Sequence, residues 1–165
     1  MRRGAPLRVS ARRGIRPGMF RSFMQTALDQ ARAAAARGEV PVGAVVTAGT
    51  DILAAAGNRC RERSDPTAHA EMLAIRAACA ARGSERLENA TLWVTLEPCA
   101  MCAQAIAHAR LARLVFGADD PKSGGVLHGA RVFTHPQTHH APQVVDGVDA
   151  DTCGALLSDF FAARR

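Results

Sequence analysis

His69-Ala70-Glu71 precedes Pro98-Cys99-Ala100-Met101-Cys102 in this chain, and the fold can be inferred outward from these two stretches. Cys99 and Cys102 are three residues apart, so on a helix both sulfurs face one side and can reach a single ion. A histidine supplied by the other stretch would complete a three-ligand zinc site that leaves the fourth tetrahedral position for water. Zinc lowers the pKa of such a water towards neutrality, and Glu71 is placed to move its protons.

Each half of this pattern also has a simpler interpretation. A lone Cys-x-x-Cys can be a redox pair, and a lone helical His-Ala-Glu is usually solvated surface. A structural zinc site would need a fourth ligand, for which Cys60, Cys79 and Cys153 are the candidates, and none of them forms a second Cys-x-x-Cys. The two halves in this order match the H-x-E…P-C-x-x-C signature of zinc nucleobase deaminases. The combination therefore favours a catalytic zinc site.

Hydrophobic patterning on either side of these stretches predicts strands that alternate with helices. The expected helices cover residues 20–37, 69–82, 98–109 and 152–165, and the expected strands cover residues 42–47, 52–56, 91–96, 113–116 and 143–146. Loops are expected at residues 57–67 and 117–142, and a turn at residues 49–51 makes the first two strands a hairpin. This order predicts the α/β class, as a three-layer α/β/α sandwich with a mixed five-stranded sheet.

Length and composition are those of one globular domain. The chain has 165 residues, of which 48% are hydrophobic. It contains no run of eighteen apolar residues, so no membrane span is expected. Five cysteines, two of them assigned to metal, leave an odd number, which argues against a disulfide framework and for a reducing compartment. One Trp and no Tyr argue against a broad aromatic platform for stacking single-stranded bases.

The net charge of +6 is concentrated at the N-terminus. Residues 1–28 hold seven Arg and no acid, so the other 14 basic residues face 15 acidic ones and the remaining body is nearly neutral. Residues 1–18 are expected to form a disordered basic tail. Their Arg-rich, acid-poor composition also resembles an organellar transit peptide. A third interpretation is that translation begins at Met19 or Met24.

Several further motifs surround the two stretches: Glu39-Val-Pro-Val-Gly-Ala44, Gly57-Asn58-Arg59, Asp65-Pro-Thr-Ala-His-Ala-Glu71, Thr95-Leu-Glu-Pro-Cys-Ala-Met-Cys102, Val115-Phe-Gly-Ala118 and Leu156-Leu-Ser-Asp-Phe-Phe161. On these motifs the chain resembles the bacterial tRNA-specific adenosine deaminases, members of the cytidine deaminase-like zinc superfamily. The resemblance covers residues 19–165, which we expect to form the zinc deaminase domain. The Asp-Pro-Thr prefix and the Phe-Phe ending resemble the tRNA group in particular.

The resemblance implies a role for each matching residue. It implies that one Zn²⁺ per subunit is bound by His69, Cys99 and Cys102, and that Glu71 transfers protons between water, the purine ring and the leaving ammonia. It further implies that Asn58 hydrogen-bonds the flipped base and that Val40 and Leu96 line the base pocket. Residues near RNA phosphates would be Lys122, Arg164 and Arg165. The expected enzyme is a homodimeric, cytoplasmic hydrolase of cyclic-amidine C–N bonds that converts the wobble adenosine of a tRNA anticodon stem-loop to inosine.

Three departures from the family pattern keep other functions open. Gln104 replaces a small residue two positions after the second cysteine, His139 replaces an Asn, and the loop at residues 124–129 lacks the usual Gly-Ser pattern. The alternatives are a deaminase of a free base or nucleoside, such as cytosine, guanine or cytidine, and a non-catalytic RNA-binding module stabilised by zinc. The Arg-rich tail leaves an organellar location open as well.

Overall fold

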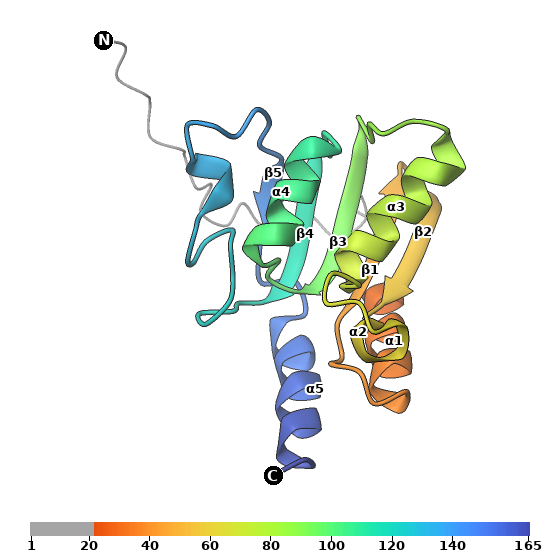
Figure 1. The fold of residues 1–165 in the computed structure, drawn as a ribbon, viewed down its shortest axis with the longest axis vertical. Coiled ribbons are helices and arrows are strands. Elements are labelled where there is room, and N and C mark those ends of the chain that lie inside the picture. The colour runs from red at the N-terminus through yellow and green to blue at the C-terminus, as the bar shows by residue number, and fades with distance from the viewer. Residues whose placement is uncertain (1–21) are drawn as a thin grey trace.

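A mixed five-stranded sheet lies at the centre of the computed structural model, which describes residues 22–165 (Figure 1). Its strands are β1 (Gly43–Ala48), β2 (Asp51–Gly57), β3 (Ala90–Leu96), β4 (Arg113–Ala118) and β5 (Gln143–Val145), in the spatial order β2-β1-β3-β4-β5. β1 runs antiparallel to both β2 and β3, whereas β3, β4 and β5 are parallel. The predicted α/β class and mixed five-stranded sheet are confirmed.

The helices cover both faces of this sheet and complete the three layers. They are α1 (Met24–Ala36), the short α2 (Cys60–Arg63), α3 (Ala70–Arg82), α4 (Ala100–His108) and α5 (Ala150–Ala162). α3 and α4 lie in front of the sheet in Figure 1, whereas α1 and α5 pack against its other face. The three-layer arrangement predicted from alternating strands and helices is therefore present.

Alternating side chains along the strands form a separate core on each face. Val45, Trp93 and Val115 are paired across β1, β3 and β4 and point towards α1 and α5. Their sequence neighbours Leu92 and Leu114 point the other way, towards α3 and α4. This period-two alternation is what a sheet covered on both sides requires.

Two glycines let the helices of the α1/α5 face approach the strand backbone. A Cβ at Gly43 of β1 would lie 2.6 Å from the Ala31 nitrogen of α1. A Cβ at Gly117 of β4 would meet the Cys153 sulfur of α5. Glycine within a strand commonly marks such close approach. The absence of a side chain at Gly43 and Gly117 therefore allows α1 and α5 to pack closely against the sheet.

Several element boundaries differ from those predicted. Residues 57–67, expected to be a loop, contain α2, a four-residue helix that is too short to show a hydrophobic period. The N–H of Glu62 in this helix donates to the Glu39 Oε1 at 2.8 Å. α4 begins at Ala100, so Pro98 precedes the N-cap residue and is not the first helical residue. A 3₁₀ turn at Val132–Thr134 interrupts the predicted long loop, and α5 begins two residues earlier than expected.

Some predictions concern residues before Ser22 and lie outside the described chain. They include the disordered tail at residues 1–18, the alternative start at Met19 and the first residues of the helix expected at 20–37. Within residues 22–165, no helix is long and apolar enough to span a membrane.

Candidate metal centre and adjoining pocket

Two helix starts bring the three predicted metal ligands together. His69 is the N-cap residue of α3 and Cys99 is the N-cap residue of α4, with Cys102 in the first turn of α4. These starts meet because β2 and β3, which lead into them, run in the same direction and end at the same edge of the sheet. The positive ends of both helix dipoles face this edge, which favours thiolate ligands.

The spacing of the ligand atoms fits a tetrahedral ion. His69 Nδ1 lies 3.7 Å from Cys99 Sγ and 3.6 Å from Cys102 Sγ, and the three atoms lie within 4.8 Å of one another. Zn–N and Zn–S bonds of ordinary length at a tetrahedral angle separate nitrogen from sulfur by about 3.5 Å. The donor set of one imidazole and two cysteines, with these nitrogen–sulfur distances, therefore suits zinc.

The start of α3 is fixed by a side chain from another element. Asn58, the residue after β2, accepts the Ala70 N–H at 2.7 Å with its Oδ1. The preceding turn is closed by Asp65, whose Oδ1 accepts the Thr67 N–H at 2.8 Å and the Thr67 hydroxyl at 2.7 Å. This explains in physical terms why the Asp-Pro-Thr stretch and Asn58 accompany the His-Ala-Glu motif.

The start of α4 is fixed by backbone. Gly124 forms an isolated antiparallel bridge with Cys99, and the Gly125 N–H donates to the Pro98 carbonyl at 2.8 Å. A Cβ at Gly125 would lie 2.5 Å from the Ala100 nitrogen. The loop after β4 therefore presses directly on the turn that carries Cys99.

Burial and hydrogen bonding set the charges of the cluster. Hydrogen bonds from the Cys102 side chain and from His69 outweigh burial and lower the pKa of Cys99 to about 4. Cys102 has a raised pKa because it donates to Cys99 and is buried. The lowered pKa favours the thiolate form of Cys99 that ligates zinc, and metal binding would release the proton of Cys102. Burial raises the pKa of the adjacent Glu71 to about 7.

A cavity of about 280 Å³ adjoins the cluster. The predicted substrate residues Asn58, Val40 and Leu96 line it beside His69, Glu71 and Cys99. Residues to which the sequence analysis gave no role in the substrate pocket also line it: Glu39, Val42, Cys60, Arg61, Glu97, Asp120 and Ser123. Glu97 could have been noticed, because it is a charged residue between an apolar strand and Pro98-Cys99.

A larger groove of about 990 Å³ continues from this cavity. The two share Val40, Leu96, Asp120 and Ser123 as lining residues. Lys122, Arg164 and Arg165, the three predicted RNA contacts, all line the groove. The structure thus places these cations next to the pocket, although they come from two segments far apart in sequence.

Other predicted candidates lie away from the ligand atoms. Cys60 lines the cavity, but the metal-binding group found within residues 22–165 consists of His69, Cys99 and Cys102 without it. Cys153 is buried under Gly117 on the opposite face of the sheet. Gln104 and His139 line a separate depression of about 210 Å³. A fourth cysteine ligand is therefore not supplied, and the two departures lie outside the cavity.

Comparison with known proteins agrees with this geometry. A model of the MafB19-like deaminase family matches residues 20–165. A tRNA-specific adenosine deaminase of Agrobacterium fabrum is 51% identical over 143 residues, covering 87% of this chain and 94% of that protein. The chain belongs to the tRNA-specific adenosine deaminase family. The family's Bacillus subtilis member is 44% identical to this deaminase, covering 87% of this chain and 89% of that protein.

A solved structure from work on A-to-I editing by tRNA:A34 deaminases at the wobble position of transfer RNA superimposes on this deaminase with a TM-score of 0.81. It is 52% identical in sequence and covers 82% of this chain and 98% of its own. The family resemblance expected from the motifs, the cytidine deaminase-like fold and the assignment as a deaminase are confirmed.

Proposed function

We propose that this deaminase hydrolyses the wobble adenosine of a tRNA anticodon to inosine and uses one zinc ion per subunit. The observation that carries this proposal is a three-ligand cluster with a buried carboxylate beside it, opening on a cavity next to a cation-lined groove. The tRNA deaminases among its relatives support the choice of substrate.

His69, Cys99 and Cys102 would hold the zinc. Three protein ligands leave room for water, and a zinc ion in such a site acidifies that water and makes it nucleophilic near neutral pH. A purely structural site would require a fourth Cys or His, and none joins the group formed within residues 22–165. The donor set therefore supports a catalytic ion.

Glu71 would carry the protons of the reaction. Its side chain is only 4% exposed, so bulk water does not compete for the proton that it holds. The carboxylate takes a proton from the attacking water and gives it to a purine ring nitrogen. The water oxygen first adds to C6 as the ring nitrogen takes this proton. The C6–N6 bond then breaks as N6 takes the second proton of the water and leaves as ammonia. One water is consumed and inosine and ammonia are formed.

The remaining pocket residues would hold the base. Because the Oδ1 of Asn58 already accepts the Ala70 N–H, this side chain has its amide N–H groups left to donate to an acceptor on the purine. Val40 and Leu96 would enclose the base edges with apolar surface. Asn58 would then serve substrate and helix start together.

The adjoining groove would accept the RNA backbone. Lys122 and Arg165 present exposed cations there, while Arg164 stacks 3.5 Å over the Phe160 ring. A base in an anticodon loop is already unpaired, so moving it into the pocket costs less than opening a duplex. We further infer from the family resemblance that the enzyme is a cytoplasmic homodimer.

The direct test is incubation of the zinc-loaded protein with an anticodon stem-loop carrying adenosine at the wobble position, and separately with cytosine, guanine and cytidine. Inosine in the stem-loop without ammonia from the small molecules is the expected result. Turnover of the small molecules alone would assign the free-base or nucleoside alternative. Stem-loop binding without ammonia release would assign the non-catalytic module.

A further inference from the structure

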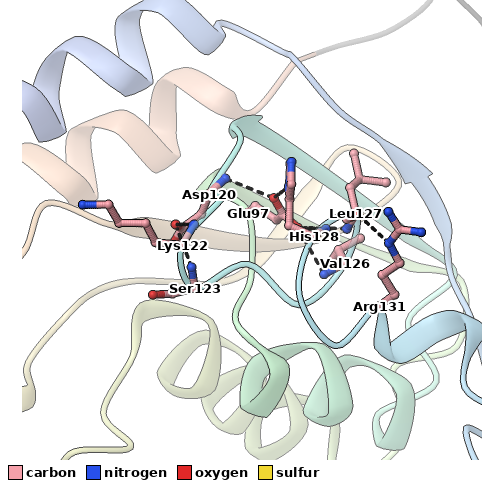
Figure 2. A network of polar contacts seen from close by, with 8 residues as sticks. All are labelled: Glu97, Asp120, Lys122, Ser123, Val126, Leu127, His128 and Arg131. Carbon is pink, nitrogen blue, oxygen red and sulfur yellow. Dashed lines mark hydrogen bonds and ion pairs between the residues drawn. The ribbon is translucent and has the colours of Figure 1, made fainter.

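Glu97 is a buried carboxylate that follows β3 directly and is 2% exposed. Its Oε1 accepts the backbone N–H groups of Val126 at 3.2 Å, Leu127 at 2.8 Å and His128 at 3.0 Å. Its Oε2 accepts the Asp120 N–H at 3.0 Å and the ring Nδ1–H of His128 at 2.7 Å. Figure 2 shows these donors converging on Glu97 from one stretch of chain.

That stretch, residues 120–128, is folded around carboxylates more than around apolar side chains. Besides the five donors on Glu97, the Asp120 Oδ1 accepts the N–H groups of Lys122 at 3.1 Å and Ser123 at 3.0 Å (Figure 2). No helix or strand ladder spans these residues, and six of their eight backbone N–H groups donate to the carboxylates of Glu97 and Asp120; those of Gly124 and Gly125 donate to backbone carbonyls. Removing the Glu97 charge would leave several of these N–H groups unpaired at once.

The same stretch touches both the metal centre and the cavity. Gly124 forms a bridge with Cys99, and Gly125 packs on the backbone of Cys99 and Ala100, where a Cβ on Gly125 would collide. A Cβ at Gly124 would also lie 2.5 Å from the Glu97 carboxyl carbon, so the loop is held closely between Glu97 and the Cys99 turn. Asp120 and Ser123, from the same stretch, line the cavity.

We propose that Glu97 is a positioning residue: through residues 120–128 it holds the Cys99–Cys102 turn in its metal-binding geometry and fixes one wall of the substrate cavity. The inference rests on the proposed function for the identity of the metal and the substrate. Glu97 also lines the cavity, but both of its carboxylate oxygens accept hydrogen bonds from residues 120–128. It acts through the loop that it organises, and its effect is therefore measurable on metal retention as well as on turnover.

Glutamine is a stringent replacement at this position. Both carboxylate oxygens face N–H donors, and a glutamine amide would turn an NH₂ group towards either Asp120 or the three amides at residues 126–128. The substitution keeps the size and shape of the side chain, but on one side the glutamine NH₂ group would face a backbone N–H group in place of an acceptor. Glu88→Gln makes the same chemical change on an exposed side chain, at the opposite end of β3, and serves as the matched control.

The first experiment measures zinc release from the loaded full-length protein to a chromophoric chelator, together with amide exchange at residues 126–128. Loss of a residue that orients metal ligands typically costs about 10-fold to 100-fold in metal affinity, so Glu97→Gln is expected to release zinc faster by about that factor. It should also lose exchange protection at those amides, whereas Glu88→Gln should match the unaltered protein. Unchanged zinc release would overturn the proposal, whatever the exchange shows.

The second measurement is stem-loop deamination with zinc in excess. The proposal expects Glu97→Gln to raise KM more than it lowers kcat, because the cavity wall moves while Glu71 stays. If KM rises and kcat falls by equal factors, and the protein is destabilised as a whole, the positioning role of Glu97 is contradicted. If Glu97→Gln does not fold, His128→Ala removes one donor from a half-exposed side chain and should give a smaller acceleration of zinc release; no acceleration would overturn the proposal.

Failure of the proposed function would be seen separately. Zinc release and amide exchange need no substrate, so they test Glu97 even if the unaltered protein leaves the stem-loop unchanged. In that event the substrate assignment falls and the positioning role is judged on metal retention alone.

Discussion

The starts of α3 and α4 perform the same task by different means. Each places a metal ligand at the N-cap in extended backbone, His69 with ψ of 151° and Cys99 with ψ of 172°, and neither ligand caps its own helix. α3 is held by one side chain, the Asn58 amide, whereas α4 is held by the backbone of Gly124 and Gly125. Occupying an N-cap with a ligand removes the usual cap, so each start needs an outside partner.

The two helix starts also carry different parts of the metal centre and of the proposed proton transfer. α3 carries one ligand and the buried Glu71, whereas α4 carries both cysteines. Substitutions on α3 can therefore separate turnover from metal binding, and disturbance of α4 acts on the metal first.

The largest expected effect is from Glu71→Ala. We expect kcat to fall on the order of 10²-fold or more, because a general acid–base of this kind contributes at least that much. Zinc content by elemental analysis should remain one per chain, since the three ligands are untouched. Full turnover in this variant would show that Glu71 takes no part in the reaction. Loss of zinc would show that turnover and metal binding cannot be separated by a substitution on α3.

Gly125→Ala should act on the α4 side. A Cβ there would lie 2.5 Å from the Ala100 nitrogen, so the loop or the Cys99 turn must shift. We expect faster zinc release to a chelator and a lower melting temperature. Gly154→Ala on α5 is the control, because its Cβ meets nothing within 4 Å and should leave zinc release unchanged. Identical behaviour of the two variants would show that the loop does not support the metal turn.

Asn58 can be dissected with two substitutions. Asn58→Ala removes the acceptor for the Ala70 N–H, and the free energy of unfolding should fall by about 1 kcal/mol, the usual effect of losing a helix cap. Asn58→Asp keeps an acceptor for that N–H but has no amide to donate to a base. Denaturant unfolding should therefore distinguish the variants, while both raise KM for the stem-loop. A native KM for Asn58→Asp would exclude a donor role towards the base.

The smallest effect is expected from removing residues 1–18. The ligands and the residues that hold both helix starts lie beyond residue 38, so a chain beginning at Met19 should deaminate at a similar rate. Its RNA affinity at low salt should be weaker, because arginines that release counterions are gone. Lost catalysis with unchanged affinity would give the tail a role in the fold or the dimer.

The metal cluster was predictable because its ligands have fixed local spacing. Cys99 and Cys102 share a helical turn, and His69 follows a turn that the Asp-Pro-Thr residues close. Short apolar runs likewise predicted every strand within residues 22–165, since each strand is buried on both faces or packed in register with a buried neighbour.

The supporting contacts could not be predicted in the same way. The donors on Glu97 come from residues 120–128, about 23 to 31 positions later in the chain, and that stretch has no hydrophobic period. The base contact expected of Asn58 stays a prediction, and the sequence pattern did not indicate that its Oδ1 also caps α3, twelve residues later. Such partners are decided by how loops close, which depends on the complete fold.

The most direct test of the two-helix account is X-ray absorption at the zinc edge of the loaded, unaltered protein. We expect two sulfur ligands at about 2.3 Å and nitrogen or oxygen ligands at about 2.0 Å completing four-coordination, as in an open catalytic site. A third sulfur in the first coordination shell, from Cys60 or any other cysteine, would contradict it and make the site structural.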